Sequence, residues 1–301
     1  MNRVVQKLDA VWRDPVFAAT YVASRAMPGY FQRTYQAKSK RAGLKGAYLI
    51  LSFDCDTEKD IEVVEGVHQK LNDLGICPSY AVPGQLLEQG RSEYGRIAAS
   101  GAEFINHGYL SHTDFVPEGR GYVSTLFYDQ LSPEEVSADI RRGHQACIDV
   151  LGQAPIGFRT PHFGTYGRKG QLRHLYSVLS ELGYRYSSST TPVSAFWNGA
   201  IQQVGNGILE LPVSGCFDFP ARILDSWGFR FSPTRTFSAQ DYVTQFDRLV
   251  NWLTSPGNVG ILNSYADPSQ VYDWDAFFEC MAKTKSLKCV SFKQLISEFN
   301  S

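Results

Sequence analysis

The sequence lacks the features that mark small disulfide-stabilised proteins and membrane-spanning ones. Its six cysteines are scattered over 301 residues without a Cys-x-x-Cys pair, so the pattern argues against a disulfide framework and predicts reduced thiols. No apolar run approaches the length of a transmembrane helix. Near the N-terminus, Asp9 and Asp14 interrupt the apolar segment that a signal peptide needs. We therefore expect a cytoplasmic protein.

The chain carries little net charge, but its charge is unevenly distributed. The total is −1, whereas residues 1–46 contain nine Lys or Arg and only two Asp. A basic leader on an acidic body argues against nucleic-acid binding by the body. We expect residues 1–46 to form one or two helices. They either pack on the domain that follows, with their basic side chains in water, or lie as a peripheral segment on the anionic inner face of a membrane.

From residue 47 to residue 301, strand-like and helix-like segments alternate. The predicted strands are Tyr48–Phe53, Pro78–Val82, Ala102–Ile105, Gly157–Arg159, Tyr184–Ser187, Ile208–Val213, Val259–Asn263 and Lys288–Ser291. The predicted helices are Asp60–Leu74, Ser92–Ser100, Pro133–Leu151, Gly170–Leu182, Ala239–Leu253 and Asp273–Thr284. Such alternation predicts a parallel sheet with helices outside it, and seven or eight units are enough to close or nearly close a barrel.

Polar residues follow several of these strands at the end where a barrel of this kind places its chemistry. Asp54 and Asp56 end the first strand, and His107 follows the third, with His112 five residues later. A catalytic zinc takes three protein ligands from carboxylate oxygen and imidazole nitrogen and keeps one position for water. Asp56, His107 and His112 can supply these ligands, which leaves Asp54 for proton transfer.

Three motifs resemble those of the polysaccharide deacetylase family, also called the NodB-homology family or carbohydrate esterase family four. They are Ser52-Phe53-Asp54-Cys55-Asp56, Asn106-His107-Gly108-Tyr109-Leu110-Ser111-His112 and Phe158-Arg159-Thr160-Pro161-His162. The resemblance covers roughly residues 47–300 and implies an α/β fold, a distorted (β/α)₇ barrel, behind the N-terminal helical extension. The Asp-x-Asp form is similar to the peptidoglycan-deacetylase-like and lipid-linked-sugar deformylase branches.

The resemblance also implies roles for individual residues. Asp54 would be the general base, oriented by a charge-assisted hydrogen bond from Arg159. Asp56, His107 and His112 would bind a divalent metal, Zn²⁺ by preference, with Co²⁺ or Mn²⁺ as alternatives. The backbone amide of His162 would face the oxyanion. The stretch that corresponds to the fourth motif, which contributes a carboxylate and a tryptophan to the substrate site, contains Asp218, Asp225 and Trp227.

Two departures from the family pattern affect these roles. The family's histidines are four residues apart, whereas His107 and His112 are five apart, which suits a loop and not a shared helix face. The family's fifth motif carries a histidine that acts as general acid, but the last histidine of this chain is His174 and Asp267 stands at the matching place. Either Asp267 with a raised pKa or His162 must replace that acid, and His162 is the preferred candidate.

The expected function is metal-dependent removal of an N-acyl group, acetyl by preference, from an amino sugar. In the cytoplasm the substrate would be a nucleotide-linked sugar or a lipid-linked glycan intermediate. Two alternatives stay open: another C–N hydrolase on the same barrel, such as a deformylase or ureide hydrolase, and a non-catalytic glycan-binding protein that has lost the fifth-motif histidine.

Overall fold

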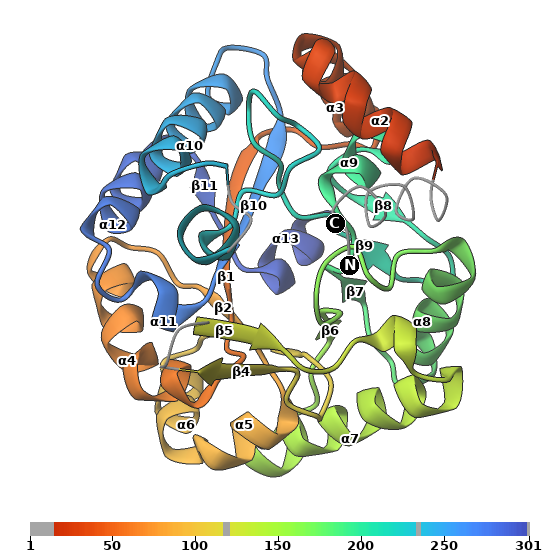
Figure 1. The fold of residues 1–301 in the computed structure, drawn as a ribbon, viewed down its shortest axis with the longest axis vertical. Helices are drawn as coiled ribbons and strands as arrows, with labels where there is room; N and C mark the ends of the chain where they lie inside the picture. Colours follow the sequence, from red (N-terminus) through yellow and green to blue (C-terminus); the bar gives the residue numbers. More distant parts are fainter. Residues whose placement is uncertain (1–14, 117–120, 233–235, 300–301) are drawn as a thin grey trace.

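The computed structural model describes residues 15–116, 121–232 and 236–299 and shows a curled sheet surrounded by helices (Figure 1). Nine of the described strands form this sheet, in the order β10-β1-β2-β3-β6-β7-β9-β8, with β11 also paired to β1. The strands are β1 (Ala47–Asp54), β2 (Ser79–Val82), β3 (Phe104–Asn106), β6 (Gly157–Phe158), β7 (Tyr186–Ser187), β8 (Gln202–Gln203), β9 (Leu209–Glu210), β10 (Gly260–Ala266) and β11 (Lys288–Cys289). Each predicted strand overlaps one of them.

The sheet is mixed and open, which corrects the expectation of a purely parallel sheet. Strand β8 runs antiparallel to β9, and the strand path does not join β9 to β10. The side chain of Asn263 in β10 closes part of this gap, since its Nδ2 donates to the carbonyl oxygens of Leu211 at 3.0 Å and Pro212 at 3.1 Å. The observed architecture is therefore a distorted, incompletely closed barrel.

Helices cover the outside of the sheet. All six predicted helices are present, as α4 (Glu58–Asp73), α6 (Arg91–Ala99), α7 (Pro133–Leu151), α8 (Lys169–Glu181), α10 (Ala239–Leu253) and α12 (Asp275–Ala282). The sequence did not predict the shorter elements α5 (Gly84–Gln89), α9 (Pro192–Asn198), α11 (Pro268–Val271), α13 (Phe292–Phe299), the 3₁₀ turns Tyr128–Gln130 and Lys283–Ser286, and the π-helical turn η2 (Trp227–Phe231).

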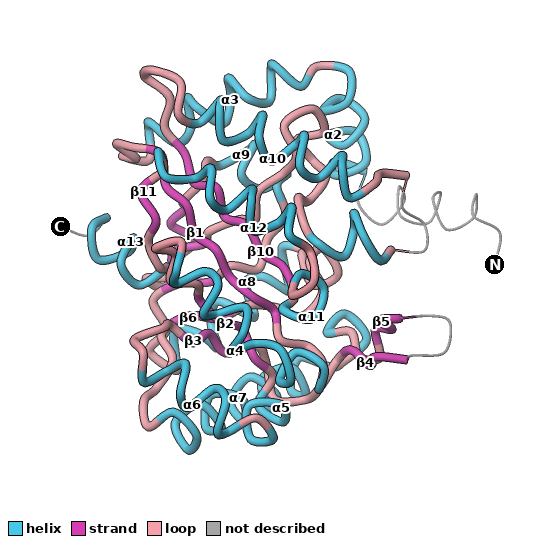
Figure 2. Tube along the Cα trace, turned by 90° about the vertical axis from the view of Figure 1, so that its left-hand side faces the viewer, coloured by secondary structure: helices cyan, strands magenta, loops and turns pink. Residues whose placement is uncertain are grey.

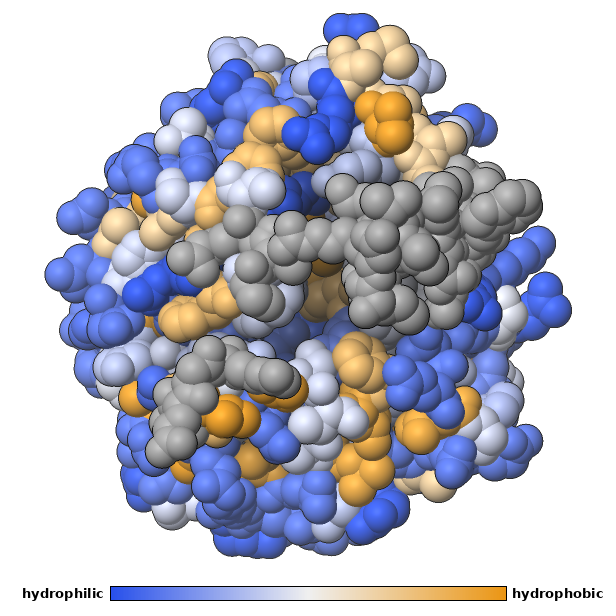
Figure 3. All heavy atoms as spheres, viewed as in Figure 1, coloured by the Kyte–Doolittle hydropathy of each residue, from blue (hydrophilic) through white to orange (hydrophobic). Residues whose placement is uncertain are grey.

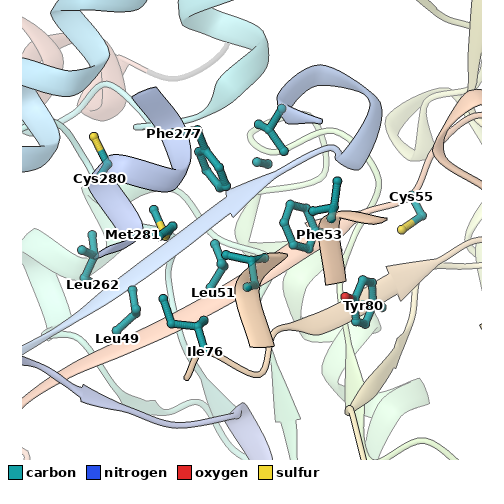
Figure 4. Packing of buried hydrophobic residues seen from close by; sticks show 14 of the residues in the cluster. Leu49, Leu51, Phe53, Cys55, Ile76, Tyr80, Leu262, Phe277, Cys280 and Met281 are labelled. Atoms are coloured by element: carbon teal, nitrogen blue, oxygen red, sulfur yellow. The ribbon is translucent and has the colours of Figure 1, made fainter. Parts of the chain in front are cut away.

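The alternation of side chains along β1 determines which residues reach the inside of the barrel. Leu49, Leu51 and Phe53 belong to the core between the sheet and the outer helices, where Phe53 lies 6.4 Å from the Phe277 ring of α12 (Figure 4). Ile50 belongs to a second core with α13, which lies within the ring of strands in Figure 1. Because successive side chains of a strand point to opposite faces, Asp54 shares the inner face with Ile50.

Cys55 continues the outward-facing set and is fully buried in the outer core. This confirms that it packs there and does not join Asp54 and Asp56 as a polar group. All six cysteines are free thiols, as the sequence predicted.

The N-terminal extension forms helices α2 (Pro15–Ala26) and α3 (Pro28–Arg41). Helix α3 packs on the barrel: the Phe31 ring stacks on Phe196 of α9 at 3.9 Å, and Gln36 donates to the Val259 carbonyl at 2.7 Å. Residues 1–14 of the predicted extension lie outside the described residues. Contact with a membrane stays a prediction. None of the helices described in the structure is long and apolar enough to cross a membrane.

A two-stranded hairpin, which the sequence analysis did not predict, stands beside the barrel. Its strands β4 (Thr113–Val116) and β5 (Gly121–Ser124) pair antiparallel. Figure 2 shows the hairpin projecting from the body on the side where α11 lies. Tyr122 of β5 donates to the Ser269 hydroxyl of α11 at 2.8 Å, and this contact ties the two elements together.

Candidate active site

An ion pair between Asp54 and Arg159 forms the floor of the site. Asp54 ends β1 and Arg159 follows β6, two parallel strands separated in the sheet by β2 and β3, so both side chains enter the barrel at the carboxyl ends of the strands. Arg159 Nη1 lies 2.6 Å from Asp54 Oδ1 and also donates to the Ser52 hydroxyl at 2.8 Å. The guanidinium is completely buried, and its Nη2 reaches the Ser188 hydroxyl at 3.2 Å. This network holds one carboxylate oxygen in place and leaves the other, Oδ2, facing His107.

Three potential metal ligands converge next to this ion pair. Asp56 Oδ1 lies 3.0 Å from His112 Nε2 and 3.4 Å from His107 Nε2. The ligand atoms of the three residues all lie within 4.8 Å of one another. Asp54 Oδ2 is farther away, 4.0 Å from His107 Nε2. Asp56, His107 and His112 can therefore hold one metal ion, with Asp54 beside it.

The hydrogen bonding of these residues fits a metal ion. Asp56 Oδ1 and the Nε2 atoms of His107 and His112 are buried without a hydrogen-bond partner, which is costly unless another ligand satisfies them. His107 Nδ1 donates to the Arg159 carbonyl at 2.8 Å, so Nε2 keeps its lone pair for a metal, an arrangement common in metal sites. Burial alone would raise the pKa of Asp56, but His112 and His107 outweigh it and hold that pKa well below its usual value.

The five-residue spacing of the histidines is accommodated by a loop. His107 directly follows β3 and His112 directly precedes β4, so residues 107–112 lie outside any helix or strand. The two imidazole rings meet edge to face, with their centroids 4.6 Å apart. The helical i, i+4 geometry is therefore not needed to bring them together.

A cavity of about 310 Å³ opens above these residues. Its carboxylates are Asp54, Asp56, Asp225 and Asp267, and its aromatic walls are Tyr122, Phe127, Phe163, Trp227 and Tyr265. Trp227 is 39% exposed and therefore lies toward solvent. In Figure 3 hydrophilic side chains predominate on this face of the molecule, with smaller apolar patches between them. Flat aromatic walls around a polar floor suit the apolar faces of sugar rings.

His162 lies in this cavity but has the properties of a neutral imidazole. Its backbone has a φ of +54°, which is uncommon for a residue other than glycine. The Nε2 of its ring donates to the His112 carbonyl at 3.2 Å. Burial, followed by the charge of His112, lowers the pKa of His162 to about 4. Near pH 7 it therefore carries no extra proton to donate.

Asp267, in contrast to His162, has a raised pKa. It immediately precedes α11, is 8% exposed, and accepts a hydrogen bond from Gln270 Nε2. Burial, with Asp56, Asp60 and Asp54 nearby, raises the pKa of Asp267 well above its usual value. A carboxyl group in such surroundings retains its proton to higher pH.

The structure separates the three residues of the predicted fourth-motif region. Asp225 and Trp227 line the cavity, and Asp225 accepts hydrogen bonds from the Gly228 amide at 2.9 Å and the Tyr265 hydroxyl at 3.0 Å. Asp218 does not line it. Arg248 Nη1 lies 2.6 Å from Asp218 Oδ2, so this carboxylate belongs to an ion pair with α10.

Several cavity residues were not identified from the sequence. Tyr265 lies in the fifth-motif region, where attention went to the missing histidine. Tyr122 lies on the unpredicted hairpin, whose short alternating segment Gly121-Tyr122-Val123-Ser124 was the available signal. Phe127 and Phe163 have no such signal, since only tertiary contacts bring loop aromatics to a cavity.

Comparison with known proteins agrees with this site. The family model for polysaccharide deacetylase matches residues 42–187, a region that includes Asp54, His107, His112 and Arg159 and ends before Asp225 and Asp267. No curated protein matches the chain.

Solved structures share the fold at low sequence identity. A protein described as a polysaccharide deacetylase from Mycobacterium smegmatis aligns with a TM-score of 0.58 and 19% identity, over 85% of this chain and 91% of that one. Another described in the same way, from Pseudomonas aeruginosa PAO1, has a TM-score of 0.58 and 10% identity, over 84% and 90%. The PuuE allantoinase has a TM-score of 0.60 and 9% identity, over 84% and 90%. The chain thus matches the polysaccharide deacetylase model over residues 42–187, the stretch that contains Asp56, His107 and His112, and shares the fold of these solved structures.

Proposed function

We propose that this protein hydrolyses the N-acyl group, an acetyl group, of an amino sugar within a glycan. The observation that carries the proposal is Asp54, fixed by Arg159 at 2.6 Å, beside three buried and unpartnered metal-ligand atoms at the floor of an aromatic-walled cavity. A divalent metal bound by Asp56, His107 and His112, with Zn²⁺ favoured by the ligand set, would polarise an amide carbonyl and make water acidic enough to attack it.

The residues around the metal ligands supply the proton transfers. Asp54 Oδ2 accepts a proton from the attacking water, because Oδ1 is already engaged by Arg159. Amide hydrolysis also requires a donor that protonates the departing amine. Asp267 takes this role in preference to His162, because its raised pKa keeps a proton on its carboxyl group while His162 stays neutral. This reverses the preference drawn from the sequence.

The charge of the cavity bears on the form of the substrate. Among the described residues that line it, four are carboxylates and none is Lys or Arg. Apart from the proposed metal, a phosphate next to the scissile amide would find no cationic side chain in that lining and would meet the negative charge of Asp54 and Asp56. The substrate is therefore a sugar whose phosphate, if it has one, lies outside the cavity, as in a lipid-linked glycan or an oligosaccharide. A sugar nucleotide, whose diphosphate adjoins the amino sugar, fits less well.

Release of acetate tests the proposal. The protein, loaded with Zn²⁺, Co²⁺ or Mn²⁺, is assayed on N-acetylglucosamine oligomers and on UDP-N-acetylglucosamine, with formamido sugars and allantoin in parallel. We expect acetate from the oligomers and at least tenfold less from the nucleotide sugar. Turnover of only the formamido sugar or allantoin would move the assignment to another C–N hydrolase. Glycan binding without any turnover would identify a non-catalytic member.

Replacement of Asp267 tests the assignment of the acid. For Asp267→Asn we expect about a hundredfold loss in kcat on an N-acetyl sugar, a typical effect of removing a general acid. Hydrolysis of 4-nitrophenyl acetate should fall less than fivefold, because its leaving group needs no protonation. The wild-type rate on the amide should fall as pH rises through the raised pKa of Asp267, and the variant should lose this dependence. A selective amide defect in His162→Ala and none in Asp267→Asn would assign the acid to His162.

A further inference from the structure

The backbone of the loop between His107 and His112 is hydrogen-bonded by a residue that lies in none of the three sequence motifs. Helix α7 presents Asp139, which is 4% exposed, toward this loop. Its Oδ1 accepts the backbone N–H of Leu110 at 2.9 Å, and its Oδ2 accepts the backbone N–H of Tyr109 at 3.1 Å. The Tyr128 hydroxyl also donates to Oδ2, at 2.5 Å. One carboxylate therefore satisfies two successive amides of the loop, one with each oxygen.

Glycines allow the helix and the loop to approach this closely. A Cβ on Gly143 of α7 would lie 2.4 Å from the Gly108 carbonyl oxygen and 2.3 Å from Asn106 Oδ1. Gly143 is four residues after Asp139, so both lie on the same face of α7. Gly108 has a φ of +81°, and a Cβ there would lie 2.4 Å from Asp139 Oδ2. The contact between α7 and the loop is therefore specific in shape as well as in hydrogen bonding.

The loop residue that Asp139 binds also contacts His112, one of the three potential metal ligands. Leu110, whose N–H binds Asp139, offers its carbonyl oxygen to His112 Nδ1 at 3.4 Å. With a proton on Nδ1, Nε2 would keep its lone pair for a metal shared with Asp56 Oδ1, which lies 3.0 Å away. Gln85 Oε1 of α5 accepts the N–H of the next loop residue, Ser111, at 2.7 Å.

We infer that Asp139 is a positioning residue for the metal site. Its carboxylate fixes the backbone at Tyr109 and Leu110, and this holds the His112 ring beside His107 although the two are five residues apart in the sequence. The inference rests on the metal site of the proposed function. The spacing of five is one residue longer than that of the family motif. Without the hydrogen bonds of Asp139 the longer loop would leave the orientation of His112 variable, and a metal would bind more weakly because it would have to order the loop.

The test is the affinity for Zn²⁺, measured by competition with a chromogenic chelator on the full chain. In Asp139→Asn, one oxygen becomes an NH₂ group that cannot accept an amide N–H. We expect the dissociation constant for Zn²⁺ to rise roughly 10- to 100-fold, the range typical when the groups that orient metal ligands are removed. Saturating Zn²⁺ should restore most of the activity. Tyr128→Phe is the matched control, since it removes a hydroxyl from Asp139 but leaves both loop amides bound, and its affinity should change less than threefold.

The outcomes separate this inference from the function on which it rests. Affinity within threefold of wild type in Asp139→Asn would overturn the role of Asp139. Absence of Zn²⁺ binding by the wild-type protein would instead overturn the metal site. If Asp139→Asn does not fold, Gly143→Ala gives a second test: its Cβ pushes α7 from the Gly108 carbonyl and should weaken Zn²⁺ binding at least tenfold. Unchanged affinity in Gly143→Ala would contradict the inference equally.

Discussion

Asp54→Asn is expected to lower kcat on an N-acetyl sugar about a thousandfold while the protein keeps its metal. The asparagine keeps a carbonyl oxygen that can accept from Arg159 Nη1, now 2.6 Å from Asp54 Oδ1, so the floor of the site should survive. What the variant loses is the oxygen that accepts the proton of the attacking water, and removal of a general base typically costs 10²- to 10⁴-fold.

The measurement combines steady-state kinetics with metal analysis of the same samples. Asp114→Asn is a suitable control because Asp114 is exposed on β4, and its activity should match the wild type. A loss smaller than tenfold in Asp54→Asn would remove Asp54 as the base. Loss of metal along with activity would show that Asp54 is itself a ligand.

Arg159→Met should produce the largest effect on stability. Arg159 is completely buried and its partner Asp54 nearly so. Removing one partner of a buried ion pair leaves an uncompensated charge, which typically costs 3–5 kcal/mol. We therefore expect the free energy of unfolding to fall by about 3–5 kcal/mol in denaturant titrations with chelator present, so that no metal compensates the charge of Asp54.

A double-mutant cycle separates the ion pair from simple packing. Asp54→Asn combined with Arg159→Met should be less destabilised than Arg159→Met alone, because the unpaired carboxylate is then absent. Arg185→Met, at an exposed position, should change stability by less than about 0.5 kcal/mol. Equal stability of Arg159→Met and the wild type would show that the pair contributes nothing to the fold.

The sequence was most informative where local pattern determines structure. Hydrophobic runs and helix periodicity predicted the alternation, and the polar residues after β1, β3 and β6 predicted which side chains meet, because parallel strands bring their carboxyl ends to one edge. The specific pairing of Asp54 with Arg159 came from the resemblance to the deacetylase motifs, and the structure contains it at 2.6 Å. The loop between His107 and His112 could also be foreseen, since a spacing of five does not suit one helix face.

Features that depend on tertiary contacts escaped prediction. The sequence gives no reason to prefer Asp225 over Asp218 as a cavity residue. In the structure Arg248 forms an ion pair with Asp218, whereas Asp225 lines the cavity. The raised pKa of Asp267 depends on burial and on carboxylates more than two hundred residues away in the chain, so the choice between Asp267 and His162 required the fold. Asp139 looked like an ordinary polar residue of a helix until α7 was placed against the loop.

The most direct test of the central claim is the metal content of the purified protein, measured by elemental analysis for the wild type and His112→Ala side by side. A site built from Asp56, His107 and His112 predicts about one Zn²⁺ per chain in the wild type and almost none in the variant. His174→Ala serves as the control, because His174 bonds to Ser137 and Pro133 of α7, away from the cluster, and it should retain its metal. Full metal content in His112→Ala, or none in the wild type, would contradict the account.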